Sequence, residues 1–236
     1  MLNNAFLLTL PAHVQDRLGR SLEPIRVSSG TDLYLPLDEV DWVYFPIAGL
    51  ISLISVMRNG DEAETGIVGR EGALGMVEAA GSGRMLYRAV VQIDLNAVRM
   101  PTSEYLSLLR GSVVLQRAVA RHTELNLAEI RQTAACRSHH KVQARLAWWL
   151  LECQDRTGYE SFYLTQEFLA AMLGAQRTTL NAAISVLRKA GLIRVGRGAI
   201  YILDRPGLER ASCECYSTIT RYRQDIEHTA PHRSAA

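Results

Sequence analysis

The sequence predicts a mixed α+β protein in which a strand-rich part, one long helix, and a helix-turn-helix with a β-hairpin follow one another. Three stretches predict this order. Residues 24–99 hold short apolar or alternating runs punctuated by glycines, and residues 113–136 continue without proline or glycine. Residues 164–204 read as two helices separated by a glycine and followed by a short hairpin. The expected division is a strand-rich domain at 1–112, a long helix at 113–137 and a helix-turn-helix domain at 138–236.

The composition is that of an ordinary globular protein. The 236 residues are 48% hydrophobic and 21% charged, which allows a core that needs no disulfide support. The first residues lack a basic leader, and no run approaches the ~18 apolar residues of a membrane span. We therefore expect a cytoplasmic protein with no membrane partner. The four cysteines are too few and too late in the chain for a secreted disulfide framework.

The net charge of +2 is unevenly distributed along the chain. Residues 1–136 contain 12 Lys+Arg and 15 Asp+Glu, whereas residues 137–236 contain 14 and 9. The first part is therefore acidic, with a net charge of −3, and the second is basic, with a net charge of +5. A basic part of this kind favours contact with a polyanion, although chance variation alone can produce such a difference.

The strand-rich part begins after a short amphipathic helix expected at residues 12–21. Asn59-Gly60 lies between two apolar runs and predicts a hairpin turn, because both residues tolerate a positive φ. Many short strands with regular turns indicate a sandwich, a barrel or a roll. The runs expected to form strands are PIRVS, DLYLP, DWVYFP, LISLISVM, AETGIV, MLYRAVVQ and NAVRM.

A short helix, SEYLSLL, is expected after Pro101, and the long helix follows it. Residues on the long helix recur at helical spacing and form a moderately apolar stripe. Such a helix can lie against its own domain and also against a symmetry mate. The stripe predicts a dimer interface made of Leu115, Ala118, His122 and Leu125. A further helix at residues 140–157 has a wide apolar face.

The helix-turn-helix starts at Thr165, a good N-cap, and its first helix ends before Gly174, which allows the left-handed turn conformation. The second helix is expected from about Gln176 to about Ala190. The segment LIRVGRGAIYILD then forms a hairpin, called the wing, and a last helix is expected at 206–224. The side chains expected to pack inward are Ala170, Leu173, Leu180, Ile184 and Leu187.

The second helix presents polar residues on its first turn and a half, which is typical of a DNA-recognition helix. In the major groove arginine pairs with guanine, asparagine with adenine, and threonine with a thymine methyl or a base edge. We therefore expect double-stranded DNA as the partner, with base contacts from Arg177, Thr178 and Asn181. A solvated helix face with ordinary polar residues is the alternative. The residues expected to contact phosphates are Thr165, Gln166, Thr179, Arg194 and Arg197.

These features together resemble the Crp-Fnr family of bacterial transcription regulators. The resemblance rests on LTQEFLAAMLGAQRTTLNAAISVLRKAGLI at residues 164–193, and also on VYFPIAGLISL and GIVGREGALG. It implies a double-stranded, jelly-roll-like β-roll as a cyclic-nucleotide-binding-like sensor and a homodimer built along the long helix. It also implies a winged helix-turn-helix that binds a palindromic DNA site, and the recruitment or blocking of RNA polymerase.

The sensor part departs from the cyclic-AMP-binding members of that family, which carry a Gly-Glu-Leu step and a later Arg-Ser/Thr pair. Ala73 stands in place of the glutamate, and Gly83 takes the place of the arginine. Without these polar anchors, cyclic AMP is not the expected effector. The alternatives left open are an unknown small-molecule effector, a ligand-independent regulator with a scaffold roll, and a cyclic-nucleotide response. The residues of the possible effector pocket are Gly72, Ala73, Leu74, Arg84 and Met85.

No metal, cofactor or catalytic group is expected. Cys213 and Cys215 are two residues apart, and on a helix such residues point about 200° apart, so that they cannot easily share one metal ion. One buried and one exposed thiol is the favoured interpretation, with a redox role left open. His139 and His140 are adjacent and diverge in a similar way. The sequence has no nucleophile–base–acid arrangement, P-loop or dinucleotide fingerprint, so the chain is not expected to be an enzyme.

Overall fold

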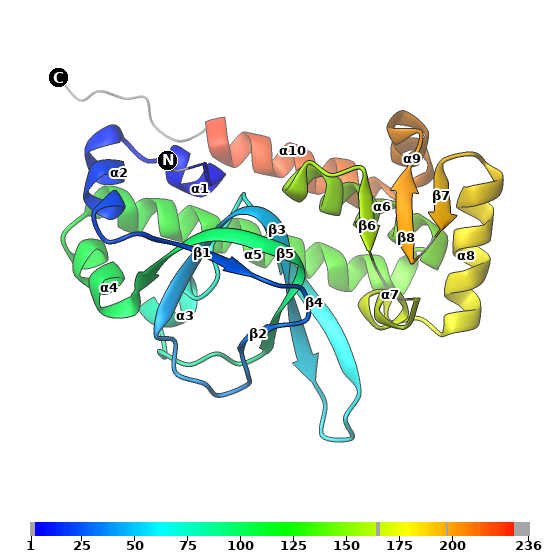
Figure 1. Cartoon of the computed structure of the whole chain (residues 1–236). Helices are drawn as coiled ribbons and strands as arrows, with labels where there is room; N and C mark the ends of the chain where they lie inside the picture. Colours follow the sequence, from blue (N-terminus) through cyan, green and yellow to red (C-terminus); the bar gives the residue numbers. More distant parts are fainter. Residues whose placement is uncertain (1–2, 164–165, 197, 229–236) are drawn as a thin grey trace.

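The structure is a computed structural model that describes residues 3–163, 166–196 and 198–228 (Figure 1). It confirms the mixed α+β architecture, because a strand-rich roll, one long helix and a helical domain with a small sheet follow one another. α8 of the C-terminal part (Arg177–Lys189) lies at the end of the molecule remote from the roll, whereas α7 (Gln166–Leu173) lies beside β4 (Glu62–Val68) of the roll (Figure 1). Among the described helices, none is long and apolar enough to cross a membrane.

The sheet of the N-terminal part has five described strands, β1 (Glu23–Val27), β2 (Asp32–Tyr34), β3 (Trp42–Val56), β4 (Glu62–Val68) and β5 (Arg88–Pro101). All their pairings are antiparallel; the order is β1-β5-β3-β4, and β2 also pairs with β5. The hairpin predicted at Asn59-Gly60 is confirmed between β3 and β4, where Gly60 has a φ of 88°.

Two strands are longer than the sequence predicts. The runs DWVYFP and LISLISVM are predicted as separate strands, but both contribute to β3, and NAVRM joins most of MLYRAVVQ in β5. Shifts of register between Pro46 and Ile51 bend β3 without ending it. At this bend Gly49 has a φ of 92°, and a Cβ there would lie 2.3 Å from the carbonyl oxygen of Asp94. The glycine therefore permits the bend and does not end the strand.

Short helices flank the roll, namely α1 (Ala5–Leu8), α2 (Ala12–Gly19), α3 (Met76–Ala80) and α4 (Thr102–Arg110). They share one apolar core with the strands, in which Leu18, Phe45, Met76 and Tyr105 are fully buried. α2 and α4 agree with predicted helices. α1 and α3 are not predicted, because segments of four and five residues are too short to show a helical period.

The long helix is α5 (Val113–His139), which confirms the helix predicted at 113–136. The Ser112 hydroxyl caps its start by accepting a hydrogen bond from the Leu115 N–H at 3.2 Å. The inner face of α5 packs on the core of the roll through Leu115, Ala118 and Val119.

The C-terminal domain contains α6 (Val142–Thr157), β6 (Ser161–Tyr163), α7 (Gln166–Leu173), α8 (Arg177–Lys189), β7 (Ile193–Gly196), β8 (Ala199–Ile202), α9 (Arg205–Ala211) and α10 (Glu214–His228). Its small antiparallel sheet has the order β6-β8-β7, so the predicted wing, β7 and β8, gains a third strand. From this domain α10 runs back along α5 toward the N-terminal helices (Figure 1).

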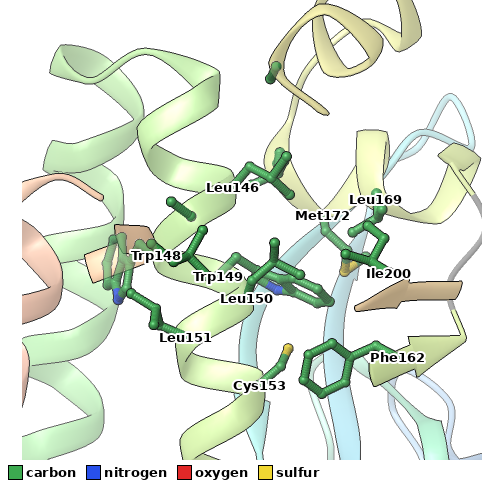
Figure 2. Close-up of a cluster of buried hydrophobic side chains, with 14 of the residues drawn as sticks. Leu146, Trp148, Trp149, Leu150, Leu151, Cys153, Phe162, Leu169, Met172 and Ile200 are labelled. Carbon is green, nitrogen blue, oxygen red and sulfur yellow. The ribbon is translucent and has the colours of Figure 1, made fainter. Parts of the chain in front are cut away.

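Two adjacent tryptophans on α6 connect the core of this domain to its neighbours. In Figure 2 the indole of Trp149 points toward Met172, whereas Trp148 lies on the other side of α6. The Trp149 N–H donates to Glu64 of β4 at 2.9 Å, and the Trp148 N–H donates to Glu152 at 3.3 Å. The core of the C-terminal domain therefore reaches the edge of the roll.

The C-terminal segment contradicts the single helix predicted at 206–224. It forms two helices, and the break falls at Ser212 and Cys213. The Ser212 hydroxyl donates to the Glu209 carbonyl at 2.7 Å, and such local side-chain bonds compete with the helical pattern. As a result Cys213 precedes α10, whereas Cys215 lies in its first turn.

A buried ion-pair network joins the roll, α5, α6 and α10. Arg156 of α6 contacts Glu71 of the roll at 2.8 Å, Glu129 of α5 at 2.9 Å and Glu152 of its own helix at 2.7 Å. Arg223 of α10 contacts Glu129 at 2.6 Å and Glu152 at 3.3 Å. Only 5% of the Arg156 side chain is exposed, so each charge in the network depends on its partners for solvation.

Replacing Arg156 with methionine should lower the free energy of unfolding by about 3–5 kcal/mol, because the change leaves buried carboxylates without their cation. Urea unfolding followed by circular dichroism measures this value. Arg88→Met is the matched control, since Arg88 pairs with Asp32 and Glu62 at the surface and should contribute no more than about 1 kcal/mol. Equal losses in the two variants would contradict the importance of the network.

Candidate nucleic-acid interface

The two helices of the helix-turn-helix pack through the residues that the sequence predicts. Leu180, Ile184 and Leu187 of α8 are buried, and so are Ala170 and Leu173 of α7. Their spacing of three or four residues places the α8 side chains on one face of the helix. The other face of α8 is therefore left to solvent.

The turn between α7 and α8 holds the two helices at a fixed angle. Gly174 has a φ of 55°, in the left-handed region, and the Ala175 N–H donates to the Ala170 carbonyl at 2.9 Å. The N-cap of α8 is Gln176, whose side chain makes no capping hydrogen bond. The first N–H groups of α8 therefore lack a side-chain acceptor, and such a helix start favours an anion such as a phosphate.

The three predicted base-contacting residues lie together on the exposed face of α8. Arg177, Thr178 and Asn181 occupy its first turn and a half, and all three are exposed. None of their side chains has a hydrogen bond or an ion pair with another residue in the part of the chain that the structure describes. α8 itself stands at the end of the molecule remote from the roll (Figure 1). Their donors and acceptors are thus free for an external partner.

Three of the five residues predicted to contact phosphates are described by the structure, and they lie on or near α8. Gln166 and Thr179 are exposed at the starts of α7 and α8. Arg194 is exposed on β7, where its guanidinium stacks 3.8 Å above the Tyr201 ring, a cation–π contact that orients the side chain. Two further predicted contacts, Thr165 and Arg197, lie outside the described residues.

One exposed cation was missed in the sequence. Arg188 lies eleven residues after Arg177, which is about three turns of helix, so both side chains leave α8 on the same side. Arg188 is exposed and extends the polar face toward the end of the helix. The helical period of 3.6 residues could have identified Arg188, because the period that places Arg177 and Asn181 on one face of the helix also places Arg188 there.

The structure places the predicted dimer stripe on the inner face of α5. Leu115, Ala118 and Leu125 are buried within the protomer, and His122 packs edge-on against Phe6 with ring centroids 5.4 Å apart. These side chains are therefore covered by their own chain and are not free to meet a second copy. Helical periodicity identifies an apolar face but does not identify what covers it.

The predicted effector residues do not enclose one pocket. Ala73, Leu74 and Met85 are buried in the core of the roll. Gly72 packs closely against α5, because a Cβ at this position would lie 2.8 Å from the His122 ring. Arg84 points away from the core into a shallow groove and lies 3.9 Å from Glu39. Three of the five predicted residues are thus core residues of the roll, and Arg84 lies apart from them at the surface.

A different cavity lies where the roll meets α5 and α6. It has a volume of about 200 Å³ and is lined by Glu64 and Val68 of β4, by Asn126 and Thr133 of α5, and by Trp149 of α6, among others. Mixed apolar and polar walls of this kind suit a small ligand. The cavity is a candidate effector site that joins the roll to the DNA-binding part.

Glu64 is one of the charged residues that line this cavity. Its side chain is buried, and desolvation raises the pKa of its carboxyl to about 7. One carboxyl oxygen accepts from Trp149, whereas Oε2 has no hydrogen-bond partner among the described residues. The sequence contains no clear signal for this residue, because Glu62 is exposed and Glu64 is buried two residues later, and a register shift interrupts the pairing of β4 with β3 after Glu64.

Comparison with known proteins agrees with this arrangement. Residues 144–211 match the family model described as the Crp-like helix-turn-helix domain. The chain is 27% identical over 175 residues to the transcriptional regulator SdrP of Thermus thermophilus, across 72% of this chain and 83% of that protein. It is 26% identical over 207 residues to the CRP-like cAMP-activated global transcriptional regulator of Mycobacterium tuberculosis, across 82% of this chain and 89% of that protein.

The fold is also similar to that of a solved regulator. The structure of FixK2 from Bradyrhizobium japonicum superimposes with a TM-score of 0.69 at 17% identity, covering 81% of this chain and 98% of that chain. The similarity therefore concerns the fold of most of the chain.

Glu64→Gln should remove a pH-dependent loss of stability. Because folding raises the pKa of this carboxyl from 4.5 to about 7, the native protein binds the extra proton, and its stability falls as the pH rises through this window. Relative to the wild type, the variant should gain about 2–3 kcal/mol between pH 5 and pH 8. Urea unfolding at both pH values measures the difference. The control Glu62→Gln, on the exposed side of β4, should show no such gain.

Proposed function

Because the chain belongs to the Crp-Fnr family of transcription regulators, we propose that it binds a palindromic DNA operator as a homodimer. The observation that carries this proposal is the exposed start of α8, where Arg177, Thr178 and Asn181 are free of internal partners. A helix of this kind enters the major groove with its first residues against the base edges. The N–H groups at the start of α8, with Gln166, Thr179 and Arg194, then contact the DNA backbone.

The proposed dimer uses the outer face of α5. Leu127 and Ile130 are 43% and 51% exposed on this helix, and Val113, Ala120 and Ala134 are exposed near them on the same side. Exposed apolar residues at this spacing along a long helix favour a coiled-coil contact with a second copy. Two-fold symmetry about α5 sets two copies of α8 about one DNA turn, ~34 Å, apart.

If the protein responds to a small-molecule effector, we propose that the effector binds in the cavity beside Glu64 and not beside Ala73. The cavity is lined by residues of β4, α5 and α6. A ligand there would therefore contact the roll, the long helix and the first helix of the C-terminal domain. The cavity is lined by carboxylates, among them Glu64, and by arginines, among them Arg145, so it offers hydrogen-bond acceptors and donors to a polar ligand. On DNA, the dimer would recruit or block RNA polymerase, as the family does.

Arg177→Ala should reduce affinity for an operator, selected from random DNA with the purified protein, by about 1–3 kcal/mol and relax the preference at one base pair per half-site. The physical reason is the loss of a bidentate contact to a guanine edge. Anisotropy titrations on operator and scrambled DNA, at several salt concentrations, measure both effects.

Arg194→Ala is the matched control for this experiment. It should weaken binding to both DNAs alike and lower the salt slope by about one unit for each lost phosphate contact. An unchanged ratio of operator to scrambled affinity in Arg177→Ala would show that Arg177 does not read a base.

Leu127→Glu should weaken the dimer at least about tenfold, because it places a charge in a desolvated helix pair. Sedimentation equilibrium measures the dissociation constant. The control is Leu86→Glu, which makes the same change at a 72% exposed position on the roll. A dimer that tolerates Leu127→Glu as well as Leu86→Glu would exclude the outer face of α5 as the interface.

A further inference from the structure

Four metal-ligand side chains meet where the end of α5 lies against the start of α10. Cys136 and His140 come from α5 and its C-cap, and Cys213 and Cys215 come from the start of α10. The four candidate ligand atoms all lie within 4.8 Å of one another. The three cysteines are buried, and His140 is partly buried.

The distances within this cluster match those around a tetrahedral zinc ion. The Sγ atoms of Cys136 and Cys213 are 3.5 Å apart, and the Nδ1 atom of His140 lies 3.4 Å from the Sγ atoms of Cys136 and Cys215. Zinc bonds of about 2.3 Å to sulfur and about 2.0–2.1 Å to nitrogen, at tetrahedral angles, separate the ligand atoms by roughly 3.5–3.8 Å. Three of the ligand-atom distances are thus close to those of a zinc tetrahedron, and all four atoms lie within 4.8 Å of one another.

The break between α9 and α10 makes this arrangement possible. Cys213 and Cys215 would diverge on one continuous helix, and for that reason the sequence predicts no shared metal ion. This prediction does not apply to the structure, because Cys213 precedes the first residue of α10. On α5, Cys136 and His140 are four residues apart, one turn of helix, and so they face the same side.

Neighbouring groups orient the ligands as they do around metal ions in proteins. The Nε2 atom of His140 lies 3.1 Å from a carboxylate oxygen of Glu214, which leaves Nδ1 to serve as the ligand. The side-chain amide of Gln132 donates to the Cys215 sulfur at 3.0 Å. A carboxylate on the far side of a histidine and an N–H donor on a sulfur are both typical of the surroundings of a metal site.

We propose that Cys136, His140, Cys213 and Cys215 bind one structural zinc ion. Three thiolates and one imidazole form a complete, soft ligand set with no position left for water or substrate, as in structural zinc sites. The ion joins the last turn of α5 to the first turn of α10. It thereby fixes the C-terminal helix beside α6, which packs against α8.

Elemental analysis of the untagged, full-length protein tests the site. We expect one zinc ion per chain in the wild type, and loss of zinc to background in Cys213→Ser and in His140→Ala. The control Cys153→Ala removes a buried cysteine of the same domain that lies outside the cluster, and it should keep its zinc. Wild-type protein with background zinc overturns the proposal, and so does zinc that persists in the Cys213→Ser variant.

Cobalt spectroscopy gives a readout that does not depend on how well the variants fold. Cobalt added to the metal-stripped wild type should give the charge-transfer and d–d bands of a tetrahedral, thiolate-bound ion. Spectra of octahedral cobalt without thiolate bands would overturn the proposal. A disulfide between Cys136 and Cys213 in protein purified without oxidant, found by mass spectrometry, would also overturn it, because it removes two ligands.

Discussion

The buried contacts of Arg156 hold the roll, the long helix and the DNA-binding part in one arrangement. Its guanidinium meets a carboxylate from the roll, one from α5 and one from α6, and Arg223 brings in α10. A buried charge that loses its partner is strongly destabilising, so these elements cannot shift separately. Even the loop beside Glu71 is adapted to the network, since a Cβ at Gly69 would lie 2.7 Å from the Cβ of Arg156.

This constraint connects the interior of the molecule to its DNA-facing end. The cavity at the junction is lined by Glu129, Glu152 and Arg156 of the network, as well as by Glu64. An occupant of this cavity would alter the solvation of the charges that place α6 relative to α5. α8 packs on α6, so a change at the cavity has a short, packed path to the recognition helix. The proposed zinc ion lies at the C-terminal end of α5. There it would hold α10 against α5 independently of the ion pairs of Arg223.

The sequence predicted the two helices of the helix-turn-helix well because their signals are local. A left-handed glycine, an apolar period and exposed polar residues on the first turn all lie within twenty residues of one another, and each reports on backbone geometry directly. The same reasoning failed for the four residues Leu115, Ala118, His122 and Leu125. Their period is helical and apolar, but Leu115 and Ala118 pack in the core of the roll and His122 packs against Phe6, and no local pattern records contacts with residues so far away in the sequence.

The sequence by itself determined the class of fold, the order of its parts and the exposed polar face of α8, because periodicity, glycine and caps act over a few residues. Only the tertiary structure decided which face of α5 is free, where a cavity remains and how charges are paired. It also decided that Cys213 and Cys215 converge with Cys136 and His140, since one break in a helix turned two diverging side chains toward α5. These features depend on contacts between segments that are distant in the sequence. The energies of such contacts depend on how deeply they are buried, and residue spacing along the chain does not reveal that burial.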